Sequence, residues 1–288
     1  MFAIGGLVFL LLCVFGSFIA SGGAIGPLVA SMPFELISIL GAAIGTFLMA
    51  NSLSDIKHTV GGLKKVLKGP AFRKADYVSM LSLLYFFVKL ANSKGATAVE
   101  AHIENPDNSS AFAAFPKLRA NHHATAMICD YFRMVGMNAD DPHQLDDIMA
   151  RELKKCLAEE LHPSHALQTM SDALPALGIV AAVLGVIKTM SKISEPPAVL
   201  GEMIGGALVG TFLGVLLAYG VVAPIAARLG AVVLEESRYY ELIRAVLVAH
   251  LHGNPPQISI ESGRKLVPNA HMPSFGELEE AVQNLQIA

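Results

Sequence analysis

One hydroxyl and several glycines lie within a long apolar stretch of this sequence, Met203 to Ala227. Thr211 is near its middle, and the small residues around it are Gly205, Gly206, Gly210 and Gly214. Small residues let another helix approach closely in a membrane, and a hydroxyl there can relay a proton or supply an oxygen ligand. A plainer interpretation stays open, because a helical threonine often bonds to a carbonyl of its own helix.

Two prolines lie in apolar stretches of this half of the chain. Pro175 belongs to the stretch Ala173 to Met190, and Pro224 to the stretch that contains Thr211. A proline inside a helix removes one backbone hydrogen bond and leaves a carbonyl about four residues earlier without its partner. The pattern indicates two hinges, although prolines in membrane helices can also serve packing alone.

Acidic residues are absent from both stretches. Glu35, Asp172 and Glu202 are expected at the ends of apolar segments and not inside them. A conducting path usually needs an ionisable or coordinating group within the bilayer. The sequence therefore predicts that any ion-carrying carboxylate comes from a partner chain, or that there is no transport.

These groups require membrane helices to position them. Hydrophobic residues make up 53% of the 288 residues and charged residues only 16%, and the mean hydropathy is +0.52. A helix of roughly 20 apolar residues spans a bilayer. We expect an all-α polytopic membrane protein with four spans, near Phe2 to Ala20, Leu36 to Leu53, Ala173 to Met190 and Met203 to Ala227. The first apolar run has no basic residues before it, so we interpret it as a retained helix and not as a signal peptide.

A basic cluster after the second span sets the expected orientation. Its members are Lys57, Lys64, Lys65, Lys68, Arg73 and Lys74. Cytoplasmic loops are enriched in Lys and Arg, so both termini are expected in the cytoplasm. The apolar run Tyr77 to Leu90 could suggest a fifth crossing, but it is too short and is more typical of a buried helix.

Four regions follow from this topology. Residues 1–53 hold the first two membrane helices, 54–172 a helical cytoplasmic domain, 173–227 the last two membrane helices, and 228–288 a cytoplasmic extension. The last helix of the cytoplasmic domain is expected from about Gln144 to Glu160. The extension should break at residues 253–256 and resume near Ser274 as a short amphipathic helix.

The sequence contains no pattern of residues that indicates a metal site or an enzyme active site. Cys13, Cys129 and Cys156 are scattered, which predicts neither a disulfide framework nor a zinc site. His122 and His123 would point about 100° apart on a helix, and His162 and His165 flank Pro163, which favours a loop. We expect no enzymatic activity, no cofactor and no nucleic-acid partner.

Several motifs together resemble the flagellar stator A subunit, the MotA/PomA family. They occur in the order expected for that family and extend over nearly the whole chain: IENP at residues 103–106, LPALGIVAAVLG at 174–185, GTFLG at 210–214, AYG at 218–220 followed by Pro224, GRK at 263–265 and PSFGELE at 273–279.

The resemblance implies a torque-generating ion channel of the bacterial inner membrane. A ring of A subunits, implied to be a pentamer, would surround two MotB-type B subunits, which carry the ion-binding aspartate and a domain that grips peptidoglycan. Pro175 and Pro224 match the family's functional prolines, and Thr211 matches a pore-lining threonine. In sodium-driven relatives the position of Ala182 is a second threonine. Since a methyl group cannot coordinate sodium, protons are the expected coupling ion.

The cytoplasmic domain should contact FliG, the rotor protein of the switch complex. Glu100 matches an acidic position of the family's rotor surface, whereas the basic position, normally arginine, falls on Asn92. Lys94 is a candidate substitute two residues further along. Glu152 is a weaker candidate, because a helix dense in charges is usually just a solvated face. Exposed ion pairs of about 0 to 1 kcal/mol suit a contact that forms and breaks repeatedly.

Two alternatives stay open. The first is a TolQ/ExbB-like proton-channel subunit that energises outer-membrane processes. Such proteins resemble the last two membrane helices, but they have three spans and lack the PSFGELE segment. A non-conducting membrane scaffold would use the same glycines and prolines for helix packing only.

Overall fold

The computed structural model describes residues 2–137 and 141–285, which form two units. Unit 1 comprises Met1–Gly69 and Leu161–Val232, and unit 2 comprises Pro70–Glu160 and Val233–Ala288. The described residues form helices and connecting loops, without a β-strand. The expected all-α class is thus confirmed.

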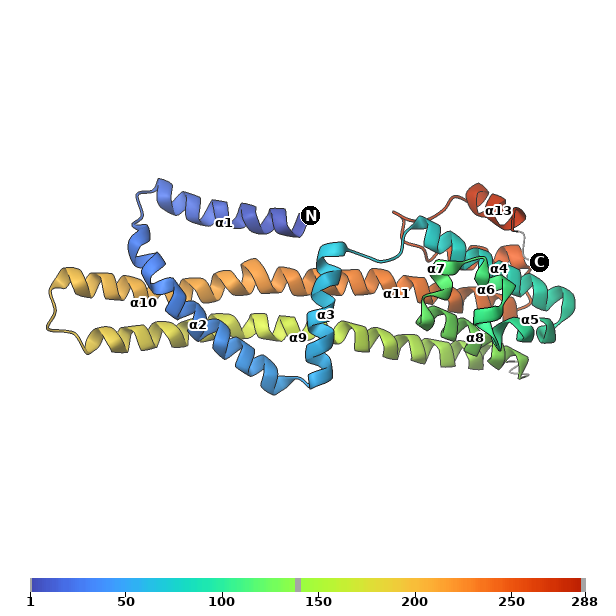
Figure 1. Cartoon of the computed structure of the whole chain (residues 1–288), viewed down its shortest axis with the longest axis horizontal. Coiled ribbons are helices and arrows are strands. Elements are labelled where there is room, and N and C mark those ends of the chain that lie inside the picture. Colours follow the sequence, from blue (N-terminus) through green and yellow to red (C-terminus); the bar gives the residue numbers. More distant parts are fainter. Residues whose placement is uncertain (1, 138–140, 286–288) are drawn as a thin grey trace. The chain divides into compact units, whose positions relative to one another are not determined.

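Unit 1 holds the long apolar helices (Figure 1). Three continuous helical segments are long and apolar enough to cross a membrane, namely Ile25–Ala50, Pro142–Met190 and Pro197–Leu251, and Ile4–Ala20 is a shorter apolar helix. The elements concerned are α1 (Phe2–Ala20), α2 (Ile25–Ala50), α3 (Leu53–Lys68), α9 (Pro142–Met190), α10 (Pro197–Leu217), a π-helical turn (Ala218–Val222) and α11 (Ala223–Leu251). The arrangement is that of a four-span membrane protein.

The second membrane helix begins earlier than expected. α2 starts at Ile25 and not at Leu36, and Pro33 lies inside it. A membrane helix tolerates an internal proline because neighbouring groups can satisfy the freed backbone carbonyl. Glu35 is consequently inside α2, so the expectation that it lies at the end of a span was wrong.

α9 is also longer than the sequence suggested. It continues unbroken through Pro163 to Met190, where a helix end near Glu160 and a loop at the two histidines were expected. Near this proline, the Ser164 hydroxyl donates to the carbonyl of Ala226 at 2.8 Å. The Nδ1 atom of His162 lies 3.7 Å from the Asp55 carboxylate. These contacts with other helices hold the segment in place despite the proline.

α9 and α10 are antiparallel and lie in direct contact, with α2 across them (Figure 1). A Cβ atom added at Gly178 would lie 2.8 Å from the carbonyl oxygen of Gly210, and one added at Gly214 would lie 2.8 Å from that of Leu174. Real Cβ atoms do not come this close to a backbone. Glycine at these positions therefore sets how closely the two helices pack.

Unit 2 is built around α4 (Lys74–Lys94). Its side chains from Tyr77 to Val88 are mostly buried in the hydrophobic core, which confirms that the run Tyr77 to Leu90 is a buried helix. The shorter elements of this unit are α5 (Ala96–Ile103), a 3₁₀ turn (Pro106–Asn108), α6 (Ser110–Ala113), α7 (Pro116–Arg119), α8 (His122–Gly136), α12 (Pro256–Arg264) and α13 (Phe275–Gln283).

The C-terminal region breaks and resumes where expected. α11 ends at Leu251, Gly253 has a φ of 78°, and Ser274 caps α13 by accepting a hydrogen bond from the Glu277 backbone N–H. Lys74 lies 2.6 Å from the Glu277 carboxylate and ties α13 to the start of α4. α12 is an addition, because no helix was predicted between the break and Ser274.

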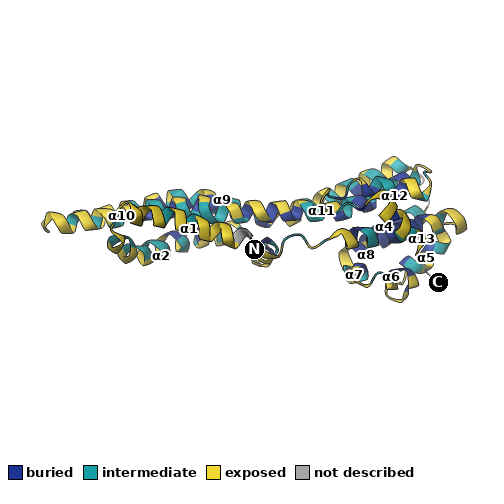
Figure 2. Cartoon of the chain, turned by 90° about the horizontal axis from the view of Figure 1, so that it is seen from above, coloured by how far each residue is buried: buried dark blue, intermediate teal, exposed yellow. Residues whose placement is uncertain are grey.

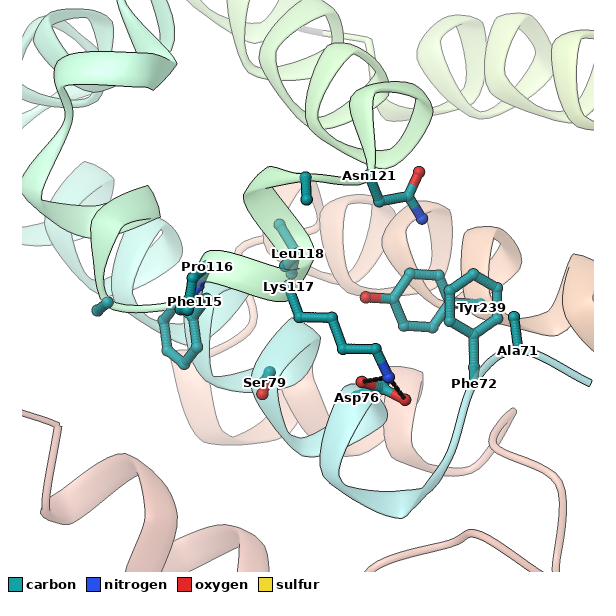
Figure 3. Close-up of a pocket in the computed structure, with 12 residues that line it drawn as sticks. Ala71, Phe72, Asp76, Ser79, Phe115, Pro116, Lys117, Leu118, Asn121 and Tyr239 are labelled. Atoms are coloured by element: carbon teal, nitrogen blue, oxygen red, sulfur yellow. Dashed lines mark hydrogen bonds and ion pairs between the residues drawn. The ribbon is translucent and has the colours of Figure 1, made fainter.

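A pocket of about 280 Å³ lies in unit 2, between α4, α7 and α11 (Figure 3). The ammonium of Lys117 is 2.7 Å from the Asp76 carboxylate beside it, and the same carboxylate accepts from the Arg73 backbone N–H at 2.8 Å. Phe72 stacks on Tyr239, with ring centroids 3.8 Å apart. The ion pair and the stacked rings link α7, α4 and α11 around the pocket.

Candidate functional site

Both prolines sit inside long helices without breaking them. Pro175 is within α9, and Pro224 is the second residue of α11, directly after the π-helical turn. Since proline has no N–H, Pro175 cannot bond to the Ser171 carbonyl, and Pro224 cannot bond to the Gly220 carbonyl. Each position therefore lacks one backbone hydrogen bond of a regular helix.

The π-helical turn before Pro224 was not foreseen. The N–H of Ala223 bonds to the Ala218 carbonyl, five residues back instead of four. This carbonyl also accepts a hydrogen bond of 2.9 Å from the hydroxyl of Ser171, which is fully buried. Single π-helical turns are often found at functional sites.

Ala182 of α9 packs against Gly210 of α10, directly before Thr211. A Cβ atom added at Gly210 would lie 3.2 Å from the Ala182 backbone nitrogen and 3.2 Å from the Ala181 side chain. Thr211 is the next residue and is partly exposed. Its hydroxyl makes no hydrogen bond to any described residue. The structure thus places Ala182 against Gly210, the residue that precedes Thr211, in the contact between α9 and α10.

Glu35 joins this group, although the sequence reasoning did not include it. Its Oε2 atom lies 2.7 Å from the place that a Cβ atom at Gly210 would take. One turn earlier, the Ser31 hydroxyl oxygen lies at the same distance from a Cβ added at Gly206. Two polar side chains of α2 therefore reach two glycines of α10.

A signal for this contact was present in the sequence. Ile25 to Met32 is apolar apart from one serine and continues the run beyond Glu35. Treating Pro33 as a helix boundary concealed it. A span drawn through this proline places Glu35 within the helix.

The predicted rotor residues lie in unit 2. Asn92 and Lys94 are exposed at the end of α4, and Glu100 is exposed on α5, which packs against α4. Gly95, with a φ of 85°, makes the turn between these helices. Glu152 differs from them, because it is half-buried and its carboxylate accepts a hydrogen bond of 2.7 Å from the Tyr131 hydroxyl.

Within residues 2–137 and 141–285, no group of three or more His, Cys, Asp or Glu side chains could hold a metal ion. Cys13, Cys129 and Cys156 are free thiols. The ring of His123 faces that of Tyr240, with centroids 4.8 Å apart.

Much of the surface of the helices of unit 1 is exposed (Figure 2), and many of the exposed residues are large and apolar. On α2, Phe34 is 74% and Ile37 73% exposed, and exposed side chains of α9 include Ile179, Val180, Val183, Leu184 and Ile187. Contiguous apolar surface of this kind marks contacts with lipid or with other chains. The helices that carry the prolines are thus suited to a membrane assembly.

Comparisons with known proteins agree with this arrangement. Residues 4–95 match the family model "Motility protein A N-terminal", and residues 118–242 match the "MotA/TolQ/ExbB proton channel family". Motility protein A of Escherichia coli K12 is 37% identical over 270 residues, which cover 94% of this chain and 91% of that protein. Chemotaxis protein LafT of Vibrio parahaemolyticus is 32% identical over 275 residues, 96% of each chain.

Solved structures share the fold. The chain superposes on a chain of C. jejuni MotAB with a TM-score of 0.72 and 17% identity, covering 93% of this chain and 95% of that one. For the flagellar MotAB stator complex from Bacillus subtilis the TM-score is 0.70 at 20% identity, with 97% and 98% covered. With the similarity to Motility protein A extending over nearly its whole length, this chain belongs to the MotA family of flagellar-motor stator A subunits.

Proposed function

We propose that this chain, together with a MotB-type B subunit anchored to peptidoglycan, forms a proton channel that converts proton flow into torque on the flagellar rotor. The observation that carries this proposal is the 37% identity to Motility protein A over 94% of the chain. The glycine-packed α9–α10 pair, which holds Thr211 and Ala182 and leads to Pro175 and Pro224, supports it. The chain is not an enzyme.

The carboxylate that carries the proton is assigned to the B subunit. α9 and α10 contribute no acid near Thr211, since Asp172 and Glu202 lie elsewhere along these helices. The exposed apolar faces of α9 and α10 would pack against B-subunit helices, other copies of this chain and lipid. A pentamer of A subunits provides such a surrounding wall.

Glu35 is included in the proposed ion path. An ionisable side chain within a membrane helix usually has a functional role, because its burial in lipid is costly. The Glu35 carboxylate approaches Gly210. Gly210 is the residue before Thr211, and it packs against Ala182 of α9. Glu35 could exchange protons with water or with the B-subunit carboxyl at this level of the membrane.

Protons are proposed as the coupling ion. A sodium ion must exchange its hydration shell for oxygen ligands, and the Ala182 side chain offers none. Thr211 supplies one hydroxyl, which is enough to relay a proton along a short chain of hydrogen bonds.

Contact with the rotor protein FliG is assigned to unit 2. Glu100 is the proposed acidic contact, and Lys94 is the proposed basic contact in place of Asn92. Glu152 is a secondary candidate, because its bond to Tyr131 reduces its freedom to pair with a rotor residue. We place the protein in the bacterial inner membrane with both termini in the cytoplasm.

Bead rotation tests the proposal directly. The chain and its cognate B subunit are expressed in a motile bacterium without its own stators, and a protonophore is then added. Stepwise recovery of rotation that stops with the protonophore supports a proton-driven stator. Rotation that follows the sodium gradient would refute the proton assignment, and no rotation despite assembly with the partner and a matched rotor would refute the stator assignment.

A further inference from the structure

Ser171 touches the backbone at both proline sites. Its own carbonyl is the one that Pro175 leaves without a helical partner, because it lies four residues before that proline. Its hydroxyl donates to the Ala218 carbonyl at 2.9 Å, in the π-helical turn that precedes Pro224. The side chain is completely buried, so this hydrogen bond does not compete with water.

The hydrogen bond from Ser171 is made to the π-helical turn, where the helical segment departs from regular α-helical geometry. In the π-helical turn the Ala218 carbonyl receives the Ala223 N–H from a position five residues on. A carbonyl oxygen has two lone pairs and can accept both bonds. Returning this turn to α-helical geometry would move the Ala218 carbonyl relative to α9 and strain or break the bond from Ser171.

We propose that Ser171 is a positioning residue that couples the two proline hinges, so that bending of α9 at Pro175 is transmitted to the π-helical turn before Pro224. The inference rests on the proposed stator function and adds a residue to it. In the resting geometry the hydroxyl holds the turn in its π form, and movement of Ser171 with α9 changes the force on the Ala218 carbonyl. The two hinges then move together instead of independently.

A second serine on α9 provides the matched control. Ser164 donates to the Ala226 carbonyl of α11 at 2.8 Å, so it makes the same kind of bond between the same pair of chain segments. That bond lies in a regular part of α11, beyond Pro224. Loss of packing energy alone would affect both serines, whereas loss of hinge coupling should affect only Ser171.

The test measures torque per stator unit and not just swimming. Wild-type chain, Ser171→Ala, Ser171→Thr and Ser164→Ala are each expressed with the B subunit in cells without their own stators. A fluorescent tag on the B subunit counts the units at a motor, and the step in bead speed at high load gives the torque of one unit. An interhelical hydrogen bond in a membrane shifts a two-state equilibrium by about threefold on average, so we expect Ser171→Ala to reduce the torque of one unit by up to about that factor.

The expected pattern is a reduced step for Ser171→Ala at normal unit numbers, with normal steps for Ser171→Thr and Ser164→Ala. A full-sized step for Ser171→Ala, or equal losses in Ser171→Ala and Ser164→Ala, would overturn the coupling. If Ser171→Ala does not assemble, Ser171→Cys replaces it, with the same criteria, because a thiol of nearly the same size is a weaker donor. Wild-type chain that assembles but gives no steps would instead refute the stator function itself.

Discussion

Glu35 is unusual at the scale of single residues, because a carboxyl group inside a membrane helix is normally avoided. Placing a charge at the centre of a bilayer costs about 2.5 to 3.5 kcal/mol by insertion measurements. α2 nevertheless carries the Glu35 carboxylate to Gly210, where a Cβ atom would lie 2.7 Å from its Oε2 atom and would push this side chain aside. The missing side chain at Gly210 gives the Glu35 carboxylate its present position beside α10.

Replacement of Glu35 tests its place in the proposed ion path. We expect Glu35→Gln to insert normally and to lower torque strongly, since the amide has a similar shape but cannot carry a proton. Glu35→Asp should keep part of the torque. Glu202→Gln serves as a control, because Glu202 is exposed near the start of α10. Bead speed at matched unit numbers is the measurement, and unchanged torque in Glu35→Gln would remove Glu35 from the ion path.

At the scale of helices, the glycine contacts allow a test of how closely α9 and α10 pack. A methyl group at Gly214 would lie 2.8 Å from the Leu174 carbonyl oxygen, whereas one at Gly205 would meet nothing within 4 Å. Overpacking of this kind costs about 1 to 3 kcal/mol. We expect Gly214→Ala to destabilise the α9–α10 contact by this amount and Gly205→Ala to have little effect.

Thermal unfolding of the purified complex with the B subunit measures the difference. A lower midpoint for Gly214→Ala than for Gly205→Ala is the expected result. Equal midpoints would mean that α9 and α10 can separate without loss, and that close packing does not depend on the glycine.

α11 contains a pH-sensitive position in unit 2. The Nδ1 atom of His250 is buried and has no hydrogen-bond partner in the described part of the chain, and burial lowers the pKa of this imidazole below its usual value. The unfolded chain therefore binds a proton at His250 more readily than the folded chain does. As pH falls below about 6.5, the usual pKa of histidine, the folded state loses stability relative to the unfolded one.

Hydrogen exchange of α11 can measure this loss. Amides near His250 should exchange faster at about pH 5.5 than at about pH 7.5, after correction for the intrinsic pH dependence of exchange. In His250→Leu this extra acid sensitivity should disappear. An identical pH response in the variant would show that another group is responsible.

Composition and periodicity predicted the helices that consist of an uninterrupted run of mostly apolar residues. The apolar runs of α1, α9 and α10 and the buried α4 belong to this group. The starts of α2 and α10 lie earlier than the sequence predicts, because α2 continues through Pro33 and α10 begins at Pro197, before its most apolar part. Proline fits the first turn of a helix, where its missing N–H costs nothing.

Contacts between segments that lie far apart in the chain could not be predicted from the sequence. The π-helical turn at Ala218 depends on local backbone geometry and on a hydroxyl 47 residues away. The approach of Glu35 to Gly210 likewise depends on how α2 crosses α10. Pro175, Pro224, Thr211 and Ala182 could be proposed in advance only through the resemblance to a family, because single residue types do not reveal such neighbours.

At the scale of the whole molecule, the membrane topology can be tested. Single cysteines at Ser194, between α9 and α10, and at His252, directly after α11, should report opposite sides of the membrane once Cys13, Cys129 and Cys156 have been replaced. We expect a membrane-impermeant maleimide to label the first position in intact spheroplasts and the second only after lysis. Labelling of both positions in intact spheroplasts would contradict a cytoplasmic C-terminus.

The π-helical turn also changes which way the rest of the helical segment faces. A turn closed by a bond of five residues inserts one extra residue, and each residue of an α-helix rotates the chain by about 100°. A helical wheel drawn in one piece from Pro197 to Leu251 would therefore assign the wrong face to the residues after Val222. Cross-linking or tryptophan scans of α11 should take their angular origin from Ala223.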